Sequence, residues 1–291
     1  MIAEASSSVT HSSADGSGGT GTSGIADLEL HLLLEGVYRV SGYDFREYAP
    51  ATLKRRIAER IRAEGAHTTT GLLDRVLHDP EAMLRFVDGL SYNASSPFRE
   101  PHFFAAFRER VVPRLRTFPH LRIWVIGSGD DAYALAILLR EADLYARTRI
   151  YATDATDAAI ERAKTGAFAA QLVEEYAQRY EEAGGTKRFS DSIDIVDGQA
   201  FYKPVLREQI VFAGHNLATD GSFNEFHVIV ARNIITHFNR TLAYRAHQVI
   251  FESLVRLGYL GLSAKESLRY TPHQRAYEEI EGTERFYRRL R

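Results

Sequence analysis

The chain has 291 residues, of which 45% are hydrophobic and 25% charged, and its formal net charge at pH 7 is −2. This balance gives no overall positive field, so we expect no nucleic-acid partner. The absence of cysteine excludes disulfides, thiolate metal ligands and a cysteine nucleophile, and it is compatible with the cytoplasm, where we expect the protein to reside. No apolar run approaches the roughly 20 residues that span a bilayer, and the N-terminus lacks a secretory-signal pattern, so we expect no membrane insertion.

The first part of the chain divides by composition. Residues 1–25 are rich in Ser, Gly and Thr and have almost nothing to bury, which predicts a disordered tail. Residues 26–92 have helical patterns, including the basic segment ATLKRRIAERIRAEG, which ends at Gly65, and a helix start at Asp79-Pro80. We predict a small all-helical domain over residues 26–92.

Strands and helices alternate in the remainder. Residues 93–120 are expected to form a linker with a helix, and the strand-like runs that follow are RIWVI, RIYATD, IVFAGHNL, FHVIVARN and YLGLSA. Their alternation with helix-length segments predicts an α/β domain over residues 121–291, with a mostly parallel sheet. Asp197-Gly198 between β-forming runs is a hairpin signal, so we expect a small antiparallel insert at about 192–212, which is either a docking surface or a surface hairpin with no partner.

The stretch IWVIGSGDDAYALAILL combines a strand, a glycine turn and a helix. Such a turn brings backbone N–H groups and a helix N-terminus close to a ligand. Here Gly127-Ser128-Gly129 lacks the third glycine of a dinucleotide fingerprint. The acids Asp130 and Asp131 would repel a pyrophosphate, so the turn favours a ligand without a diphosphate.

The next strand ends in ATD, and Asp154 follows the glycine turn by about 25 residues. An acid at that position accepts hydrogen bonds from a ribose diol. Together with the turn it indicates a nucleoside ligand such as S-adenosylmethionine. The alternative is that Asp154 simply caps the following helix.

Two further segments follow predicted strands. GHNL offers Asn216 to an adenine edge, and ARNIITHF offers Arg232 and Asn233 to the far side of a ligand, because ligands bind beyond the carboxyl ends of strands in open α/β sheets. Upstream, SSPFREP places Arg99 just before the α/β domain, either at the site or in a surface ion pair.

The order of these motifs resembles that of the chemoreceptor glutamate methyltransferases, the CheR family. That family has a TLKRRI-like basic helix, N-x-T-x-F-F-R-D/E-P, a W-x-A-G-C-S-T-G-E-E-P-Y-S loop, A-T-D, H-N-L, C-R-N-hydrophobic-hydrophobic-Y-F and a closing G-x-S-E-S-L. In the same order, from about Asp27 to the C-terminus, this chain has TLKRRI, NASSPFREP, WVIGSGDDAYA, ATD, HNL, ARNIITHF and GLSAKESL.

The resemblance implies a Rossmann-like S-adenosylmethionine methyltransferase domain preceded by the helical domain. It implies methyl transfer to a glutamate side chain of a methyl-accepting receptor, with S-adenosylhomocysteine as the product, and no metal. Carried over position by position, it implies catalytic roles for Arg99 and His237. The implied cofactor site consists of Asn93, Ser95, Arg99, Gly127, Asp130, Asp154, Asn216, Leu217, Arg232, Asn233 and His237.

The chain also departs from the family pattern around one cavity. Its glycine loop is two residues shorter, Ser95 replaces Thr, Pro97 replaces Phe, and His237 stands where the family has Tyr. Two interpretations follow. The protein is a methyltransferase with altered geometry or acceptor, or it is a catalytically degenerate relative that binds the nucleoside or another ligand as a regulatory or interaction module.

The expected partner is a methyl-accepting receptor or another acidic helical signalling protein. The basic helix carries Lys54, Arg55, Arg56 and Arg60, which we expect to dock an acidic helix together with the hairpin near Asp197. The alternative is that this basic side is only a solvated helix face.

Overall fold

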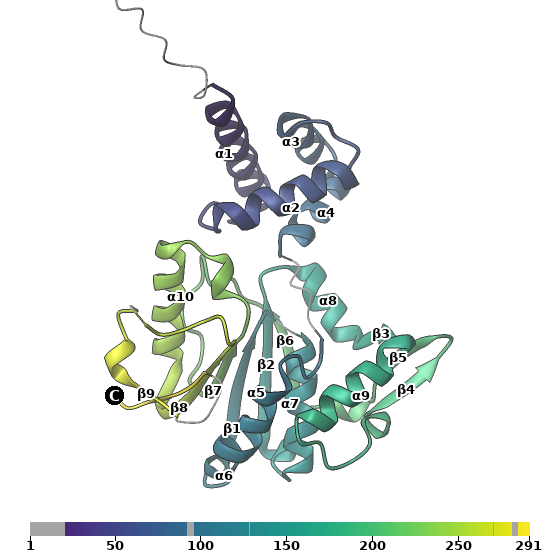
Figure 1. The fold of residues 1–291 in the computed structure, drawn as a ribbon, viewed down its shortest axis with the longest axis vertical. Coiled ribbons are helices and arrows are strands. Elements are labelled where there is room, and N and C mark those ends of the chain that lie inside the picture. Colours follow the sequence, from purple (N-terminus) through teal and green to yellow (C-terminus); the bar gives the residue numbers. More distant parts are fainter. Residues whose placement is uncertain (1–20, 92–95, 128, 270, 281–284) are drawn as a thin grey trace, which may run out of the picture.

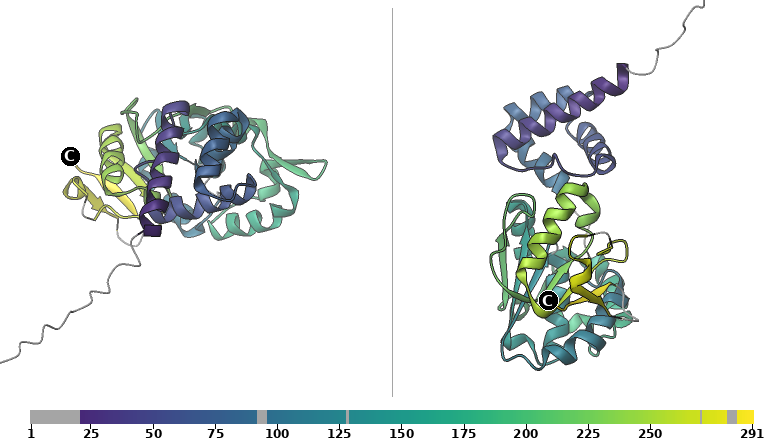
Figure 2. Two further views of the ribbon diagram at one scale, coloured as in Figure 1. Left: turned by 90° about the horizontal axis from the view of Figure 1, so that it is seen from above. Right: turned by 90° about the vertical axis from the view of Figure 1, so that its left-hand side faces the viewer.

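The computed structural model describes residues 21–91, 96–127, 129–269, 271–280 and 285–291. A small helical domain stands above an α/β domain, on the side to which the central strands point (Figure 1). This confirms the predicted fold class, a helical domain followed by an α/β domain with a mostly parallel sheet. Two further views show the helices stacked over the same end of the sheet (Figure 2).

The helical domain contains α1 (Gly21–Ser41), α2 (Pro50–Ala63), α3 (Thr69–His78) and α4 (Pro80–Ser91). Their apolar faces enclose a separate core that includes Leu33, Val37 and Phe86. The predicted disordered tail is wrong for residues 21–25, which belong to α1. Once the packed part of α1 is nucleated, each added residue contributes a backbone hydrogen bond and extends the helix. Residues 1–20 of that predicted tail lie outside the described residues.

The main sheet has seven strands in the order β6-β2-β1-β7-β8-β10-β9. The first five are parallel, whereas β10 runs antiparallel to both β8 and β9. The sequence analysis missed β9 and β10 because such short segments show no clear alternation. The strands are β1 (Leu121–Ile126), β2 (Thr148–Asp154), β6 (Ile210–Gly214), β7 (Phe226–Ala231), β8 (Leu254–Leu262), β9 (Tyr277–Glu279) and β10 (Phe286–Arg289).

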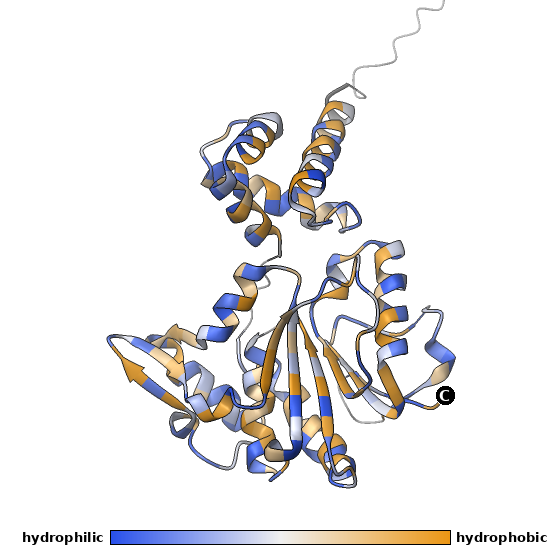
Figure 3. Cartoon of the chain, turned by 180° about the vertical axis from the view of Figure 1, so that it is seen from behind, coloured by the Kyte–Doolittle hydropathy of each residue, from blue (hydrophilic) through white to orange (hydrophobic). Residues whose placement is uncertain are grey.

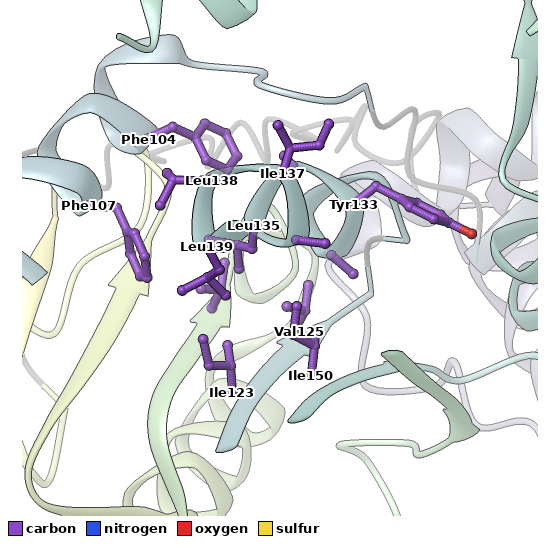
Figure 4. Packing of buried hydrophobic residues seen from close by; sticks show 14 of the residues in the cluster. Phe104, Phe107, Ile123, Val125, Tyr133, Leu135, Ile137, Leu138, Leu139 and Ile150 are labelled. Atoms are coloured by element: carbon purple, nitrogen blue, oxygen red, sulfur yellow. The ribbon is translucent and has the colours of Figure 1, made fainter. Parts of the chain in front are cut away.

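Helices cover both faces of this sheet: α7 (Gly129–Glu141), α8 (Asp157–Thr165) and α10 (Arg240–Ser253) connect its strands. The segment before β1 forms α5 (Pro101–Ala106), a π-helical turn (Phe107–Val111) and α6 (Val112–Leu115). The middle of helix α7, residues 132–139, carries apolar side chains on every side. A helix with this pattern is buried on all sides, and these residues are buried in the core. Leu135, Leu138 and Leu139 pack between the sheet and the phenylalanines that precede it (Figure 4). The central strands are mostly hydrophobic, whereas hydrophobic and hydrophilic residues alternate along the outer helices (Figure 3).

The predicted insert is a second, three-stranded antiparallel sheet in the order β3-β5-β4. Strands β4 (Ile193–Val196) and β5 (Gln199–Tyr202) form the expected hairpin, and Asp197 and Gly198 both have positive φ, at 50° and 77°, as a type I′ turn requires. The third strand, β3 (Ala167–Ala169), was not predicted. It precedes α9 (Val173–Glu182), so the insert begins earlier than residue 192.

Among the described residues, no helix combines the length and the apolar character needed to cross a membrane.

Candidate active site

A cavity of about 480 Å³, counting the space open to solvent, lies between the carboxyl ends of the strands and the helical domain. The α/β domain lines it with residues that follow β1, β2, β6 and β7, and the helical domain contributes two side chains from the opposite side. These residues are Ile126, Gly127, Asp154, Ala155, His215, Asn216, Leu217, Ile234, His237 and Phe238, together with Tyr48 and Arg56.

The glycine turn after β1 is shaped by close packing. Gly127 has φ +70°, and a Cβ atom there would lie 2.2 Å from Cδ1 of Ile234. Its N–H donates to the carbonyl of Thr153 at 2.6 Å, which fixes the turn against β2. Only glycine fits, and the missing side chain leaves backbone at the cavity wall.

Asp154 ends β2 with its carboxyl group in the cavity wall. Its Oδ1 accepts the N–H of Thr156 at 3.2 Å, and its backbone carbonyl accepts the N–H of His215 at 2.9 Å. Burial raises the pKa of Asp154 to about 6, against an ordinary 3.8. Thr156, whose Oγ1 accepts the N–H of Ala159, caps helix α8, so the alternative that Asp154 is the helix cap is wrong.

The segment after β6 supplies an apolar and amide-bearing wall. Leu217 is buried, and Asn216 uses Oδ1 to accept the N–H of Ala218 at 2.9 Å. The ring of His215 packs edge-on against Trp124, with centroids 5.0 Å apart. This wall can hold a flat heterocycle against aliphatic and amide groups.

The helical domain closes the cavity through the connection between α1 and α2. The N–H of Ala49 donates to the carbonyl of His237 at 2.7 Å, and the N–H of Asn239 donates to the carbonyl of Glu47 at 2.8 Å. Between these bonds, the ring of Tyr48 packs against Phe238 at 5.3 Å. The helical domain is therefore fastened directly to the segment that carries His237.

Arg56 of α2 is buried, and its Nη1 donates to the carbonyl of Leu90. Desolvation lowers the pKa of this guanidinium below its usual range, but an arginine stays cationic in proteins. Across the cavity, burial lowers the pKa of His237 to about 4, with the positive charges of Arg56 and Arg55 adding to the effect. His237 is therefore neutral at physiological pH.

Comparison with known protein families identifies the family of the chain that forms this cavity. Residues 93–286 match the CheR methyltransferase SAM binding domain, and residues 28–91 match the CheR methyltransferase all-alpha domain. The chain belongs to the CheR methyltransferase family. The resemblance read from the sequence is thereby confirmed.

Individual relatives cover most of this CheR chain. A protein named Cher3 from Pseudomonas putida is 38% identical over 265 residues, which is 90% of this chain and 97% of that protein. A chemotaxis protein methyltransferase from Listeria monocytogenes is 28% identical over 250 residues, covering 84% and 92%. Chemotaxis protein methyltransferase 1 from Pseudomonas aeruginosa is 29% identical over 203 residues, covering 64% and 70%.

The cofactor of this CheR protein is S-adenosylmethionine, as predicted. The described residues fit it. The glycine turn leaves exposed backbone, Asp154 is a desolvated acceptor that a hydroxyl-bearing ligand would satisfy, and His215, Asn216 and Leu217 line the cavity with an aromatic ring, an amide and an aliphatic side chain.

Several predicted cofactor residues do not line the cavity. The guanidinium of Arg232 is buried in an ion pair with Asp131, with Nη1 at 3.0 and 3.1 Å from the two carboxylate oxygens. Its Nη2 donates to Glu100 at 2.8 Å, and the group lies 4.3 Å above the ring of Phe103. Burial opposes the charge on Arg232, but the two carboxylates outweigh it and raise its pKa. Arg232 thus ties α7 to the segment before α5.

Three other predicted residues also lie away from the cavity lining. The side chain of Arg99 is exposed, and its backbone carbonyl accepts a hydrogen bond from Arg232. Asn233 has φ +58° and donates its N–H to Glu266 at 2.9 Å. Asp130 is half-buried in the first turn of α7. The predicted contacts of Asn93 and Ser95 lie outside the described residues.

The predicted docking helix needs one correction. Lys54 and Arg55 are exposed and pair with Asp27 at 2.9 Å and Glu59 at 3.1 Å, and Arg60 is half-buried. Arg56 instead points inward to the cavity, because in a helix of 3.6 residues per turn it shares the buried face with Leu53 and Ile57.

The sequence analysis missed Tyr48, Asp131 and Glu266. Tyr48 lies in no motif and reaches the cavity from another domain. The sequence analysis named Asp131 as one of two acids in the glycine loop, but the family pattern gave the cofactor role to its neighbour Asp130. Glu266 lies in the quoted segment GLSAKESL, and the structure shows that its side chain is buried. An acid that closely follows a predicted strand was the signal that could have found it.

Proposed function

We propose that this protein transfers a methyl group from S-adenosylmethionine to a glutamate side chain of a methyl-accepting chemoreceptor. The observation that carries the proposal is the placement of a buried cation, Arg56, across the cavity from the nucleoside-binding residues. The names of the Listeria and Pseudomonas aeruginosa relatives support a chemotaxis substrate. Membership in the family and the retained cavity favour this activity over a non-catalytic binding module.

On the cofactor side, we assign Asp154 to the ribose hydroxyls, Asn216 and Leu217 to the adenine, and the backbone of Gly127 to the remainder of the molecule. S-adenosylmethionine supplies a methyl group on a positively charged sulfonium. Ligand binding stabilises the ionised form of Asp154, because hydrogen bonds donated by the ribose replace the water that burial has removed from its carboxylate. Beside Asp154, the ring of His215 packs edge-on against Trp124 and the side chain of Leu217 is buried.

On the acceptor side, we assign Arg56 to the glutamate carboxylate. A glutamate has an ordinary pKa near 4.3, so it is already the nucleophile at neutral pH and needs no general base. The carboxylate loses its charge as the ester forms, and a cation therefore favours the ground state over the transition state. Arg56 accordingly acts by positioning, for which its planar set of N–H donors suits a carboxylate.

His237 suits this arrangement because it is neutral. An imidazolium beside a sulfonium would oppose cofactor binding, and burial together with Arg56 prevents that charge. The sequence analysis expected a catalytic role for Arg99, whose side chain is exposed. We transfer that proposal to Arg56.

The exposed cations of α2 and the β4–β5 hairpin remain the proposed docking surfaces for an acidic receptor helix. Lys54 and Arg55 are exposed on the same helix as Arg56, which lines the cavity, so a helix docked on them could present a glutamate to Arg56. Rim charges of this kind act mainly on the association rate and are screened by salt.

The test is transfer of labelled methyl groups to receptor fragments by wild type, Arg56→Gln and the matched control Arg55→Gln. We expect Arg56→Gln to lose at least tenfold in kcat/KM for the acceptor while its affinity for S-adenosylhomocysteine changes less than threefold. Arg55→Gln should match wild type at high salt. Equal loss in both variants would contradict the placement of the acceptor carboxylate, and no transfer by wild type would contradict the function.

A further inference from the structure

The cavity wall after β7 is held by an unusual set of hydrogen bonds. Four consecutive backbone N–H groups, from Asn233 to Thr236, all donate to the single carboxylate of Glu266. Oε2 accepts from Asn233 at 2.9 Å, and Oε1 accepts from residues 234, 235 and 236 at 2.9, 2.8 and 3.3 Å. Successive N–H groups that converge in this way form an anion-binding concavity.

Glu266 is itself fixed in place. Its side chain is buried, and Oε2 also accepts both the N–H of Ser263 at 3.1 Å and the Ser263 hydroxyl at 2.8 Å. Both carboxylate oxygens therefore accept hydrogen bonds, five from backbone N–H groups and one from a hydroxyl. An amide in the same place would turn an NH₂ group toward N–H donors, so the site requires a carboxylate.

This backbone would not hold its shape unaided. Asn233 has φ +58°, a left-handed conformation that costs energy for a residue with a side chain, and the segment then tightens into a single 3₁₀ turn at Ile235–His237. No regular helix satisfies these four N–H groups, and an unpaired buried N–H is costly. Glu266 supplies the acceptor that the first N–H groups of a helical turn lack.

The segment carries both of the contacts that define the wall. The side chain of Ile234 sits against the glycine turn, where a Cβ on residue 127 would lie 2.2 Å from its Cδ1. His237 lines the cavity, and its carbonyl receives the N–H of Ala49 from the helical domain. A shift of this segment would move the cofactor turn, the imidazole and the domain contact together.

We propose that Glu266 is a positioning residue, whose carboxylate holds residues 233–236 so that Ile234 and His237 form the cavity wall at the geometry that cofactor binding needs. The inference rests on the proposed function for the identity of the site. It concerns the cavity wall and not the chemistry of the acceptor.

The test compares Glu266→Gln with the exposed control Glu252→Gln and with a milder second variant, Ser263→Ala, which removes one of the donors that anchor the carboxylate. Affinity for S-adenosylhomocysteine is followed by the fluorescence of Trp124, the one tryptophan of the chain, and by calorimetry. NMR of the His237 ring, identified with a His237→Gln variant, reports the wall directly.

We expect Glu266→Gln to weaken S-adenosylhomocysteine binding at least tenfold and to shift the His237 ring signals. Ser263→Ala should weaken binding two- to fivefold, and Glu252→Gln should match wild type. If both variants unfold at lower temperature but keep wild-type affinity and an unchanged His237 spectrum, Glu266 is merely structural and the proposal is overturned. Absence of binding by wild type would instead overturn the proposed function, so the two failures are distinguishable.

Discussion

Replacing Asp154 by asparagine should stabilise the free protein and weaken its cofactor binding at the same time. The carboxyl is buried, and its pKa of about 6 against an ordinary 3.8 measures how strongly the fold resists its charge. A tenfold change in an acid constant is worth about 1.4 kcal/mol, so the ionised group costs about 3 kcal/mol at neutral pH. Asparagine removes that charge and keeps an oxygen for the N–H of Thr156.

The expected gain in the free energy of unfolding is about 1–2 kcal/mol at pH 7, because the amide also loses some hydration on burial. Its pH dependence has a definite sign. The folded pKa of Asp154 lies above the unfolded value, so the wild type loses stability as the pH rises from about 4 to about 6. The advantage of the variant should therefore be absent below about pH 4 and complete above about pH 6.

Binding should change in the opposite direction. A neutral amide accepts weaker hydrogen bonds than a carboxylate, which predicts about a tenfold or greater loss of affinity for S-adenosylhomocysteine. The assays are urea unfolding at several pH values and titration calorimetry, with the exposed, neighbouring Asp157→Asn as the matched control. A variant that binds as tightly as wild type, or that gains no stability at pH 7, would refute the assignment of Asp154 as a desolvated ligand acceptor.

Three further changes test other parts of the site. Gly127→Ala places a methyl group 2.2 Å from an isoleucine side chain, so affinity for S-adenosylhomocysteine should fall at least tenfold, whereas Gly198→Ala, also at positive φ but with open space around it, should leave calorimetric affinity unchanged. Asp131→Asn removes one of the two carboxylates that pair with the buried cation of Arg232 and should lower the free energy of unfolding in urea by about 3 kcal/mol. The pKa of His237 near 4 lies below the ordinary 6.5, so its ring should not titrate by NMR between pH 8 and 6, and the protein should lose stability as the pH falls from about 6.5 toward 4. Equal losses in the two glycine variants, an unaffected Asp131→Asn protein, or His237 titration near pH 6.5 would each count against the site as described.

Three of the residues that the sequence analysis proposed for the cofactor site line the cavity and share one property. Gly127, Asp154 and Asn216 each follow a parallel strand closely, and the carboxyl ends of parallel strands meet at one edge of the sheet. The periodic patterns of the strands were sufficient to bring these three together. The Asp-Gly turn likewise predicted its hairpin, since both positions need a positive φ.

The residues that it misplaced depend on packing between distant segments. Arg56 was interpreted as one more cation of an exposed helix face, and only the docking of the helical domain turns it toward the cavity. Arg232 follows β7, as a ligand-binding residue would, but its length lets it reach Asp131 on a neighbouring helix. The helical period puts Arg56 on the buried face of α2, but it does not say what that face meets, and it does not encode the Arg232 contact. Both contacts are set by the relative placement of whole elements.

The most direct test of the central claim is chemical identification of the product. Receptor fragments would be incubated with S-adenosylmethionine and the protein, and mass spectrometry would locate the added methyl groups before and after mild base. The account predicts methyl esters on glutamate that base removes as methanol, and their formation at least tenfold more slowly when Arg56→Gln replaces the wild type. Base-stable methylation at nitrogen, or fragments left unmodified by a protein that binds S-adenosylhomocysteine, would contradict it.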